Sequence, residues 1–123
     1  MKIIITILSF ILLSNVSFAQ SKNVEATIKV YGNCGMCKKR IETALDTKGI
    51  KQATWNTKTK DLQVIYNASK ITETEIHQLV ASVGHDTDKV KAKDEVYADL
   101  PFCCLYRDHD HSGIKEEPHG NHQ

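Results

Sequence analysis

The apolar residues of this chain switch between strand spacing and helix spacing in a regular order, and this order constrains the fold more than any other feature. Residues 24–31 alternate apolar and polar side chains, which predicts a half-buried strand. Apolar residues at helical spacing follow, so we expect a helix that opens at Cys37 and stops near Gly49. The residues with this helical spacing are Ile41, Ala44 and Leu45.

A hairpin and a second helix are expected next. Residues 50–56 and 62–66 read as two strands, and the short turn between them makes an antiparallel hairpin. Thr72 with Glu75 three residues later is the capping-box signature of a second amphipathic helix, which we expect to end at Gly84.

The complete order is β-α-β-β-α-β, with residues 85–93 as a weaker candidate for the fourth strand. This order predicts an α+β, ferredoxin-like βαββαβ sandwich over residues 23–92. In that fold a four-stranded antiparallel sheet carries both helices on one face.

The first 19 residues have the composition of a secretory signal peptide. A short positive start is followed by a nearly unbroken apolar run and by small residues before the expected cleavage point. We therefore predict that residues 1–19 are removed, that the chain is exported, and that its compartment is the periplasm. The apolar run is shorter than the roughly 20 residues of a membrane span, so none is expected after processing. A retained N-terminal anchor helix is the alternative.

The remaining chain is close to electrically neutral. Removing Lys2 from the 16 basic residues leaves 15, against 15 acidic residues. Nucleic acid is therefore not an expected partner, since phosphate binding needs a basic surplus. All four cysteines lie in the part of the chain that remains after the predicted cleavage. Disulfides are common in exported proteins because their compartment is oxidising, so two structural disulfides are the simplest alternative to a metal site.

Cys34 and Cys37 lie where the first strand gives way to the first helix. The N-terminus of a helix carries partial positive charge, and the basic run of residues 38–40 adds cations. Both effects favour the thiolate, which is the form that binds metal or attacks a disulfide. Two thiolates with few other donors suit a soft ion of low coordination number, above all Cu(I).

With the Cys-x-x-Cys of "VYGNCGMCKKRIE" at this junction, the chain resembles the heavy-metal-associated domain family. This family includes copper chaperones, modules of copper-transporting ATPases and the periplasmic mercury-binding protein. The resemblance spans about residues 23–92, including "GI" after the first helix and "VGHD" after the second. It implies that Cys34 and Cys37 bind the metal, with Cu(I) as the expected ion and Hg(II) or Zn(II) as alternatives.

The motif departs from the family at two places. The family usually has a methionine two residues before the first cysteine, and Gly32 stands there in this chain. Met36 lies between the cysteines instead, where it would shield the ion or add a weak thioether contact. The loop after the second helix carries His85 where an aromatic residue is common. His85 is a candidate third ligand or donor to the site, and a solvated loop histidine is the alternative.

A second cysteine pair follows the expected domain. Cys103 and Cys104 are neighbours and poorly placed to chelate one ion through both sulfurs, and a disulfide between them would be strained. Either one could reach Cys34 and Cys37 if residues 93–106 fold back over the metal loop. The apolar residues around the pair favour such a docked segment, and a structural or intermolecular disulfide is the alternative.

Residues 107–123 read as a disordered, histidine-rich tail. His109 and His111 are weak candidate ligands there for Cu(II), Zn(II) or Ni(II), and a merely solubilising tail is the alternative. His77, in the second helix, is expected at the surface.

These patterns predict an exported, non-enzymatic metallochaperone that buffers a soft metal ion or transfers it to a partner. The expected partner is a membrane metal transporter or another cysteine-containing carrier. The alternative function is a thiol–disulfide oxidoreductase that uses Cys34 and Cys37. The element order and the absence of a proline at a strand start argue against it, because the only prolines are Pro101 and Pro118.

Overall fold

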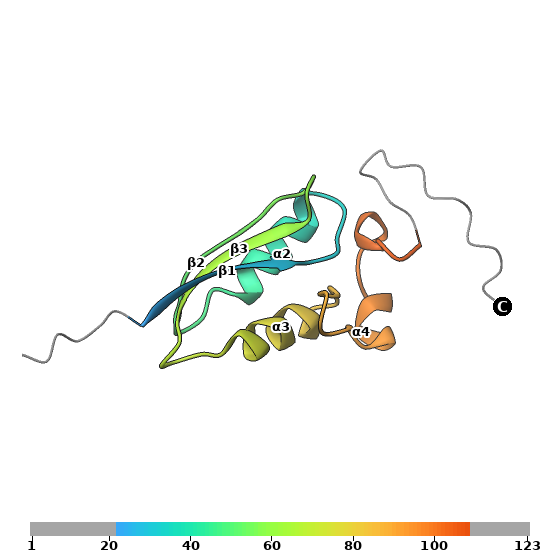
Figure 1. Ribbon diagram of the computed structural model, residues 1–123. Helices are drawn as coiled ribbons and strands as arrows, with labels where there is room; N and C mark the ends of the chain where they lie inside the picture. Colours follow the sequence, from blue (N-terminus) through green and yellow to red (C-terminus); the bar gives the residue numbers. More distant parts are fainter. Residues whose placement is uncertain (1–21, 109–123) are drawn as a thin grey trace, which may run out of the picture.

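A three-stranded antiparallel sheet forms one layer of the protein (Figure 1). The computed structural model describes residues 22–108. The strands are β1 (Asn23–Lys29), β2 (Ile50–Trp55) and β3 (Asp61–Asn67), and β3 lies in the middle. The pairing of β2 with β3 confirms the expected hairpin. None of the helices in the described part of the chain is long and apolar enough to cross a membrane.

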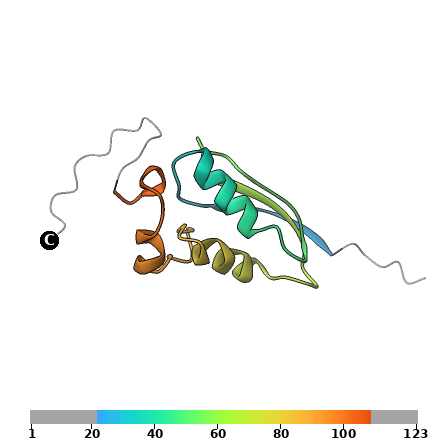
Figure 2. The same cartoon turned by 180° about the vertical axis from the view of Figure 1, so that it is seen from behind.

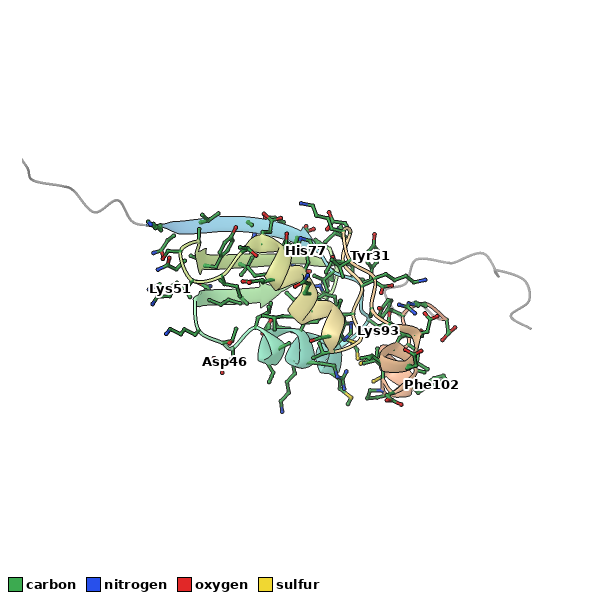
Figure 3. All side chains as sticks on the ribbon, turned by 90° about the horizontal axis from the view of Figure 1, so that it is seen from below. Tyr31, Asp46, Lys51, His77, Lys93 and Phe102 are labelled. Atoms are coloured by element: carbon green, nitrogen blue, oxygen red, sulfur yellow. The ribbon has the colours of Figure 1, made fainter. Side chains whose placement is uncertain are left out.

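Two helices, α2 (Gly35–Ala44) and α3 (Glu73–Ser82), pack on one face of the sheet. Figure 3 shows α3 in front of the strands, with α2 beside it. The core between the layers is apolar because each element turns one stripe of aliphatic side chains inward. Its fully buried aliphatic members include Ile28, Ile41, Leu45, Leu62, Val64, Ile76 and Val80.

The ends of the helices follow the sequence signals closely. The Thr72 hydroxyl accepts a hydrogen bond from the Glu75 N–H at 3.2 Å, and the Glu75 carboxylate accepts one from the Thr72 N–H at 3.0 Å, which confirms the capping box. Gly84 follows α3 at a φ of 102°, a left-handed conformation that glycine adopts without strain. Helix α2 begins two residues earlier than expected, so Cys37 lies within its first turn and Cys34 is the N-cap residue.

The expected fourth strand is absent from the described residues. A single antiparallel bridge joins Val30 to Thr87, and the chain then turns away from β1. The physical reason is competition from side chains. The Thr87 hydroxyl accepts from the N–H groups of Lys89 and Val90, and the Asp86 carboxylate accepts from the Ala92 N–H at 2.7 Å. Backbone donors that a strand would have paired with β1 are therefore satisfied within a turn.

The expectation for His77 was wrong. Its side chain is 1% exposed, and its Nδ1 lies 2.5 Å from the Thr87 hydroxyl oxygen. The turn that replaces the fourth strand packs against α3 and covers this histidine. The helical pattern of α3 alone places His77 outside the aliphatic stripe, and only the position of the turn decides its burial.

The C-terminal segment folds back against the end of the sheet–helix unit where the β1–α2 loop lies (Figures 1 and 2). It contains α4 (Asp94–Ala98) and a short 3₁₀ helix, η2 (Phe102–Cys104). Leu100, Cys104 and Tyr106 are buried in the same core cluster as the sheet and helices. Residues 93–106 are thus packed on the domain rather than extended from it.

Arg107 and Asp108, which we assigned to the tail, take part in this packing. The Arg107 guanidinium forms a two-pronged hydrogen-bonded ion pair with Asp86, at 2.7 and 3.1 Å. The same group donates to the Ala92 carbonyl at 2.8 Å and to Asp94 at 3.0 Å. Bidentate arginine–carboxylate pairs are strong and directional, so this contact fixes the segment in one orientation. The predicted signal peptide of residues 1–19 and residues 109–123 of the predicted tail lie outside the described residues.

Candidate metal centre

The β1–α2 loop positions Cys34 and Cys37 at the start of α2. Cys34 has extended backbone, and its carbonyl accepts the Lys38 N–H at 3.0 Å, which starts the helix. Three residues on, Cys37 is fully buried and accepts a hydrogen bond from the Asn33 N–H at 3.4 Å. The Cys34 side chain is half-buried, and the two sulfurs lie 3.7 Å apart.

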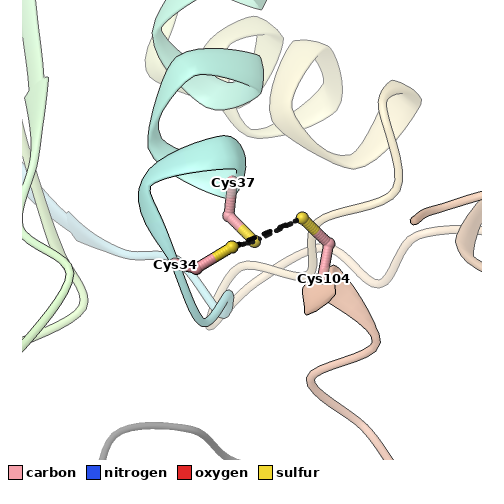
Figure 4. Close-up of side chains that lie close together, drawn as sticks. All are labelled: Cys34, Cys37 and Cys104. Carbon is pink, nitrogen blue, oxygen red and sulfur yellow. Dashed lines mark hydrogen bonds between the residues drawn. The ribbon is translucent and has the colours of Figure 1, made fainter. Parts of the chain in front are cut away.

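Cys104 adds a third sulfur from the C-terminal segment. Figure 4 shows its side chain reaching from η2 toward the two cysteines at the start of α2. The Cys104 sulfur lies 2.7 Å from that of Cys37 and 4.0 Å from that of Cys34. Cys34, Cys37 and Cys104 are the one group of potential metal donors in the described residues whose atoms all fall within 4.8 Å of one another. The Asn33 side chain joins the two elements, because its Nδ2 donates to the Cys103 carbonyl at 3.3 Å.

The spacing of these sulfurs suits a three-coordinate soft ion. Metal–sulfur bonds of about 2.3 Å in a planar trigonal arrangement place the sulfurs about 4 Å apart. Two of the three separations, 3.7 and 4.0 Å, already match that value. The third, 2.7 Å between Cys37 and Cys104, must widen by about 1.3 Å to admit an ion with such bonds. A small outward shift of η2 would provide this, since Cys104 lies on a short turn rather than on the sheet.

The pKa values of the Cys34 and Cys104 thiols are shifted in opposite directions. Burial raises the pKa of the Cys34 thiol, but hydrogen bonds from the Cys37 N–H, the Cys103 side chain and the Met36 N–H outweigh burial and lower the pKa to about 7. Burial, and then the neighbouring Cys37 sulfur, raise the pKa of Cys104. The Arg40 guanidinium donates to the Cys104 sulfur at 3.3 Å and opposes that rise. Cys34 is therefore the thiol that is ready to act as a thiolate near neutral pH.

We expect Cys34 to be alkylated first when the reduced protein is treated with iodoacetamide at pH 7. About half of the Cys34 side chains are then thiolate at a pKa of about 7, against about 3% for an ordinary thiol. The rate should rise with pH and level off above the Cys34 pKa. Peptide mapping by mass spectrometry at several pH values measures this. Faster modification of Cys103, whose pKa is raised by its hydrogen bond to Cys34, would contradict the prediction.

The glycine at position 32 has a packing reason. A Cβ at Gly32 would lie 3.0 Å from Cη2 and 3.2 Å from Cζ2 of Trp55, and 3.2 Å from Cβ of Cys37. The buried indole ring of Trp55 thus occupies the space into which a side chain at position 32 would project. Its Nε1 donates to the Val30 carbonyl at 3.0 Å and holds the ring beneath the loop. The indole therefore leaves no room for a side chain at position 32, where the family usually has a methionine.

Gly32→Ala should destabilise the metal-free protein by about 1–3 kcal/mol, because the added methyl group overpacks the contact with Trp55. Gly35→Ala is the matched control. Nothing lies within 4 Å of a Cβ at Gly35, and alanine favours the first turn of α2, so this variant should be neutral or slightly stabilised. Urea denaturation measures both. Equal effects of the two substitutions would show that the indole ring does not restrict position 32.

The other predicted site residues lie in different places. His85 is fully buried; its Nδ1 lies 2.8 Å from the Tyr31 carbonyl oxygen, and its ring stacks on Tyr106. Burial lowers the pKa of His85 to about 4. It is not one of the three donors that lie within 4.8 Å of one another, and through Tyr106 it contacts the segment that carries Cys104. The Cys103 sulfur points instead to Met36, at 3.4 Å. His109 and His111 lie outside the described residues.

Two polar residues at the site were not predicted as functional. Asn33 contacts both the Cys37 sulfur and the Cys103 carbonyl, and Arg40 donates to Cys104. Arg40 was noted only as part of the basic run. For Asn33, the sequence offers only an amide side chain next to Cys34. Its role at the site depends on the hydrogen bond to Cys103, a residue 70 positions away in the sequence, which no local pattern predicts.

Comparison with known proteins agrees with this geometry. Residues 27–86 match the family described as the heavy-metal-associated domain. Among solved structures, a CopZ metallochaperone is 27% identical, with a TM-score of 0.50 over 52% of this chain and 98% of that chain. The water-soluble region of the P-type ATPase CopA from Bacillus subtilis is 28% identical, with a TM-score of 0.52 over 55% of this chain and 46% of that chain.

MerP from Ralstonia metallidurans CH34, in its oxidised form, shares the fold at 18% identity, with a TM-score of 0.51 over 54% of this chain and 94% of that chain. No curated protein sequence matches the chain. The resemblance drawn from the Cys-x-x-Cys motif and the order of elements is confirmed. Over residues 27–86, this chain matches the heavy-metal-associated domain family.

Proposed function

We propose that the protein is an exported carrier that binds one Cu(I) through Cys34, Cys37 and Cys104 and transfers it to another protein. The observation that carries the proposal is the convergence of these three sulfurs, from α2 and η2, within 4.8 Å of one another. The CopZ metallochaperone, similar over nearly all of its length, supports a carrier role.

The donor set favours Cu(I) over Zn(II). In the described residues the group within 4.8 Å consists of three thiols alone, and three thiolates suit a soft ion that accepts low coordination numbers. Structural Zn(II) sites are almost always closed by four ligands, and the described residues offer a group of three. Hg(II), another soft ion, remains the closest competitor on this chemistry.

Transfer would start at Cys34. Cys37 and Cys104 are fully buried, whereas Cys34 is half-buried and has the lowered pKa. An incoming thiolate of a partner could therefore reach the ion on the Cys34 side and replace one protein sulfur at a time. We propose a cysteine-containing carrier or a membrane metal transporter as that partner. Export through the signal peptide of residues 1–19 would place the exchange outside the cytoplasm.

The test is an anaerobic competition of the reduced protein against a coloured Cu(I) chelator of known affinity. We expect the first equivalent to be withheld from the chelator and X-ray absorption to give three sulfur neighbours. Cys104→Ser should bind more weakly with two sulfur neighbours. Free exchange of the first equivalent with the chelator, together with catalysis of insulin disulfide reduction, would overturn the proposal in favour of a thiol–disulfide oxidoreductase.

A further inference from the structure

Two more sulfur atoms lie at the edge of the group formed by Cys34, Cys37 and Cys104. Cys103 and Met36 face each other across the gap between η2 and α2, with Sγ and Sδ 3.4 Å apart. From the sequence we expected the neighbours Cys103 and Cys104 to be poorly placed to chelate one ion. In η2, however, their sulfurs lie 3.9 Å apart, which is close to the spacing of two sulfurs on one trigonal ion. Five sulfur atoms therefore form one continuous array, in which neighbouring members are 2.7 to 4.0 Å apart.

The array has an inner and an outer part because neighbouring residues of a short turn point in different directions. Cys104 is fully buried, whereas the Cys103 side chain is partly exposed. Met36 is 53% exposed, so its thioether is open to solvent. An exposed methionine beside a cysteine offers solvent a thioether and a thiol together, and both are soft ligands.

We propose that Cys103 and Met36, with Cys104 as a shared ligand, form a second, outer Cu(I) position. The inference rests on the proposed inner Cu(I) position. Each thiol loses its proton on binding, and the Cys104 thiolate uses separate lone pairs for the two ions. The charge is balanced in part by the Arg40 guanidinium, which already donates to the Cys104 sulfur at 3.3 Å.

The outer position gives an ion from solvent a route into the inner site, separate from the Cys34 side where transfer to a partner would start. An ion that arrives from solvent can bind Met36 and Cys103 directly, because Met36 is exposed and Cys103 is partly exposed. It then moves inward by exchanging these ligands for Cys34 and Cys37 while Cys104 stays bound. A weaker outer site of this kind is a loading position and allows the protein to carry two ions when copper is abundant.

The stoichiometry of Cu(I) binding tests the inference. Reduced protein is loaded with excess Cu(I) under anaerobic conditions, and native mass spectrometry measures the number of ions bound per chain. Competition titrations give the affinity of the first and of the second binding step. We expect two Cu(I) per monomer for the unaltered protein and one for Cys103→Ser. Met36→Leu keeps the size of the side chain, and it should weaken only the second step, by about tenfold, since a hydrocarbon replaces a thioether.

The first equivalent serves as the internal control. If Cys103→Ser binds it with unchanged affinity, the C-terminal segment is still docked and the loss of the second ion is local. One Cu(I) per chain in the unaltered protein, or a second ion that appears only in a dimer, would overturn the outer position and leave the proposed function intact. Failure to bind even the first equivalent would overturn both.

Discussion

The double variant Cys34→Ser/Cys37→Ser is expected to lose high-affinity Cu(I) binding, with the affinity falling about a thousandfold or more, which corresponds to about 4 kcal/mol. Serine has nearly the shape of cysteine, but its hydroxyl is a hard, neutral donor that a soft ion does not favour. The variant leaves one of the three converging sulfurs, that of Cys104, and no buried chelate. Anaerobic competition with a Cu(I) chelator measures the change.

Two controls separate loss of the ligands from loss of the fold. Because Cys37 is fully buried, a hydroxyl there also costs stability, so circular dichroism and urea denaturation must show a folded chain. The single variant Cys34→Ser, at a half-buried position, should weaken binding without that cost. Cys103→Ser is the matched cysteine control and should keep the first equivalent. Unchanged affinity in the folded double variant would place the principal site elsewhere, with Cys103, Cys104 and Met36 as the first place to search.

Trp55→Ala is expected to have the largest effect on folding, a loss of about 3–5 kcal/mol in the free energy of unfolding. The indole is 1% exposed and lies between the sheet and the metal loop, against Gly32 and Cys37. Truncation removes its buried apolar surface, leaves a cavity beneath the loop and leaves the Val30 carbonyl without its side-chain donor. Urea denaturation of the metal-free protein measures the loss.

Thr54→Ala is the matched control, because Thr54 is the exposed neighbour of Trp55 on β2 and its truncation should change stability by less than about 0.5 kcal/mol. Trp55→Phe should fall between the two, since it keeps a ring in the core but not the hydrogen bond to Val30. A stability loss for Trp55→Ala no larger than that of the control would mean that the loop does not depend on the indole.

Local patterns were sufficient to predict most elements of the fold. Strand alternation and helical spacing are properties of short segments, and so are the capping box of Thr72 and Glu75 and the left-handed glycine after α3. These signals reported the order of elements correctly up to α3. They failed at residues 85–93, because the alternation of Val90 and Ala92 with lysines does not reveal that Thr87 and Asp86 capture the backbone donors of that segment.

The candidate site, like the fold, combines a feature that local sequence predicts with one that depends on long-range packing. The Cys-x-x-Cys spacing brings Cys34 and Cys37 together at the start of α2 because three residues make about one helical turn, so the pair is a local feature. Cys104 lies 67 residues from Cys37 in the sequence, and its place beside that residue depends on the docking of a whole segment. The ion pair of Arg107 with Asp86 and the hydrogen bond of Asn33 to Cys103 hold that segment in place.

The sequence by itself therefore determined the family, the order of the main elements and the pair of cysteines at the helix start, since each is encoded within a turn or an alternating run. The tertiary structure decided which of the remaining cysteines faces the pair and which faces Met36. It also decided that His77 and His85 are buried, and that the Trp55 indole occupies the space into which a side chain at position 32 would project. These outcomes depend on contacts between segments distant in the chain, and no local pattern specifies how two such segments pack.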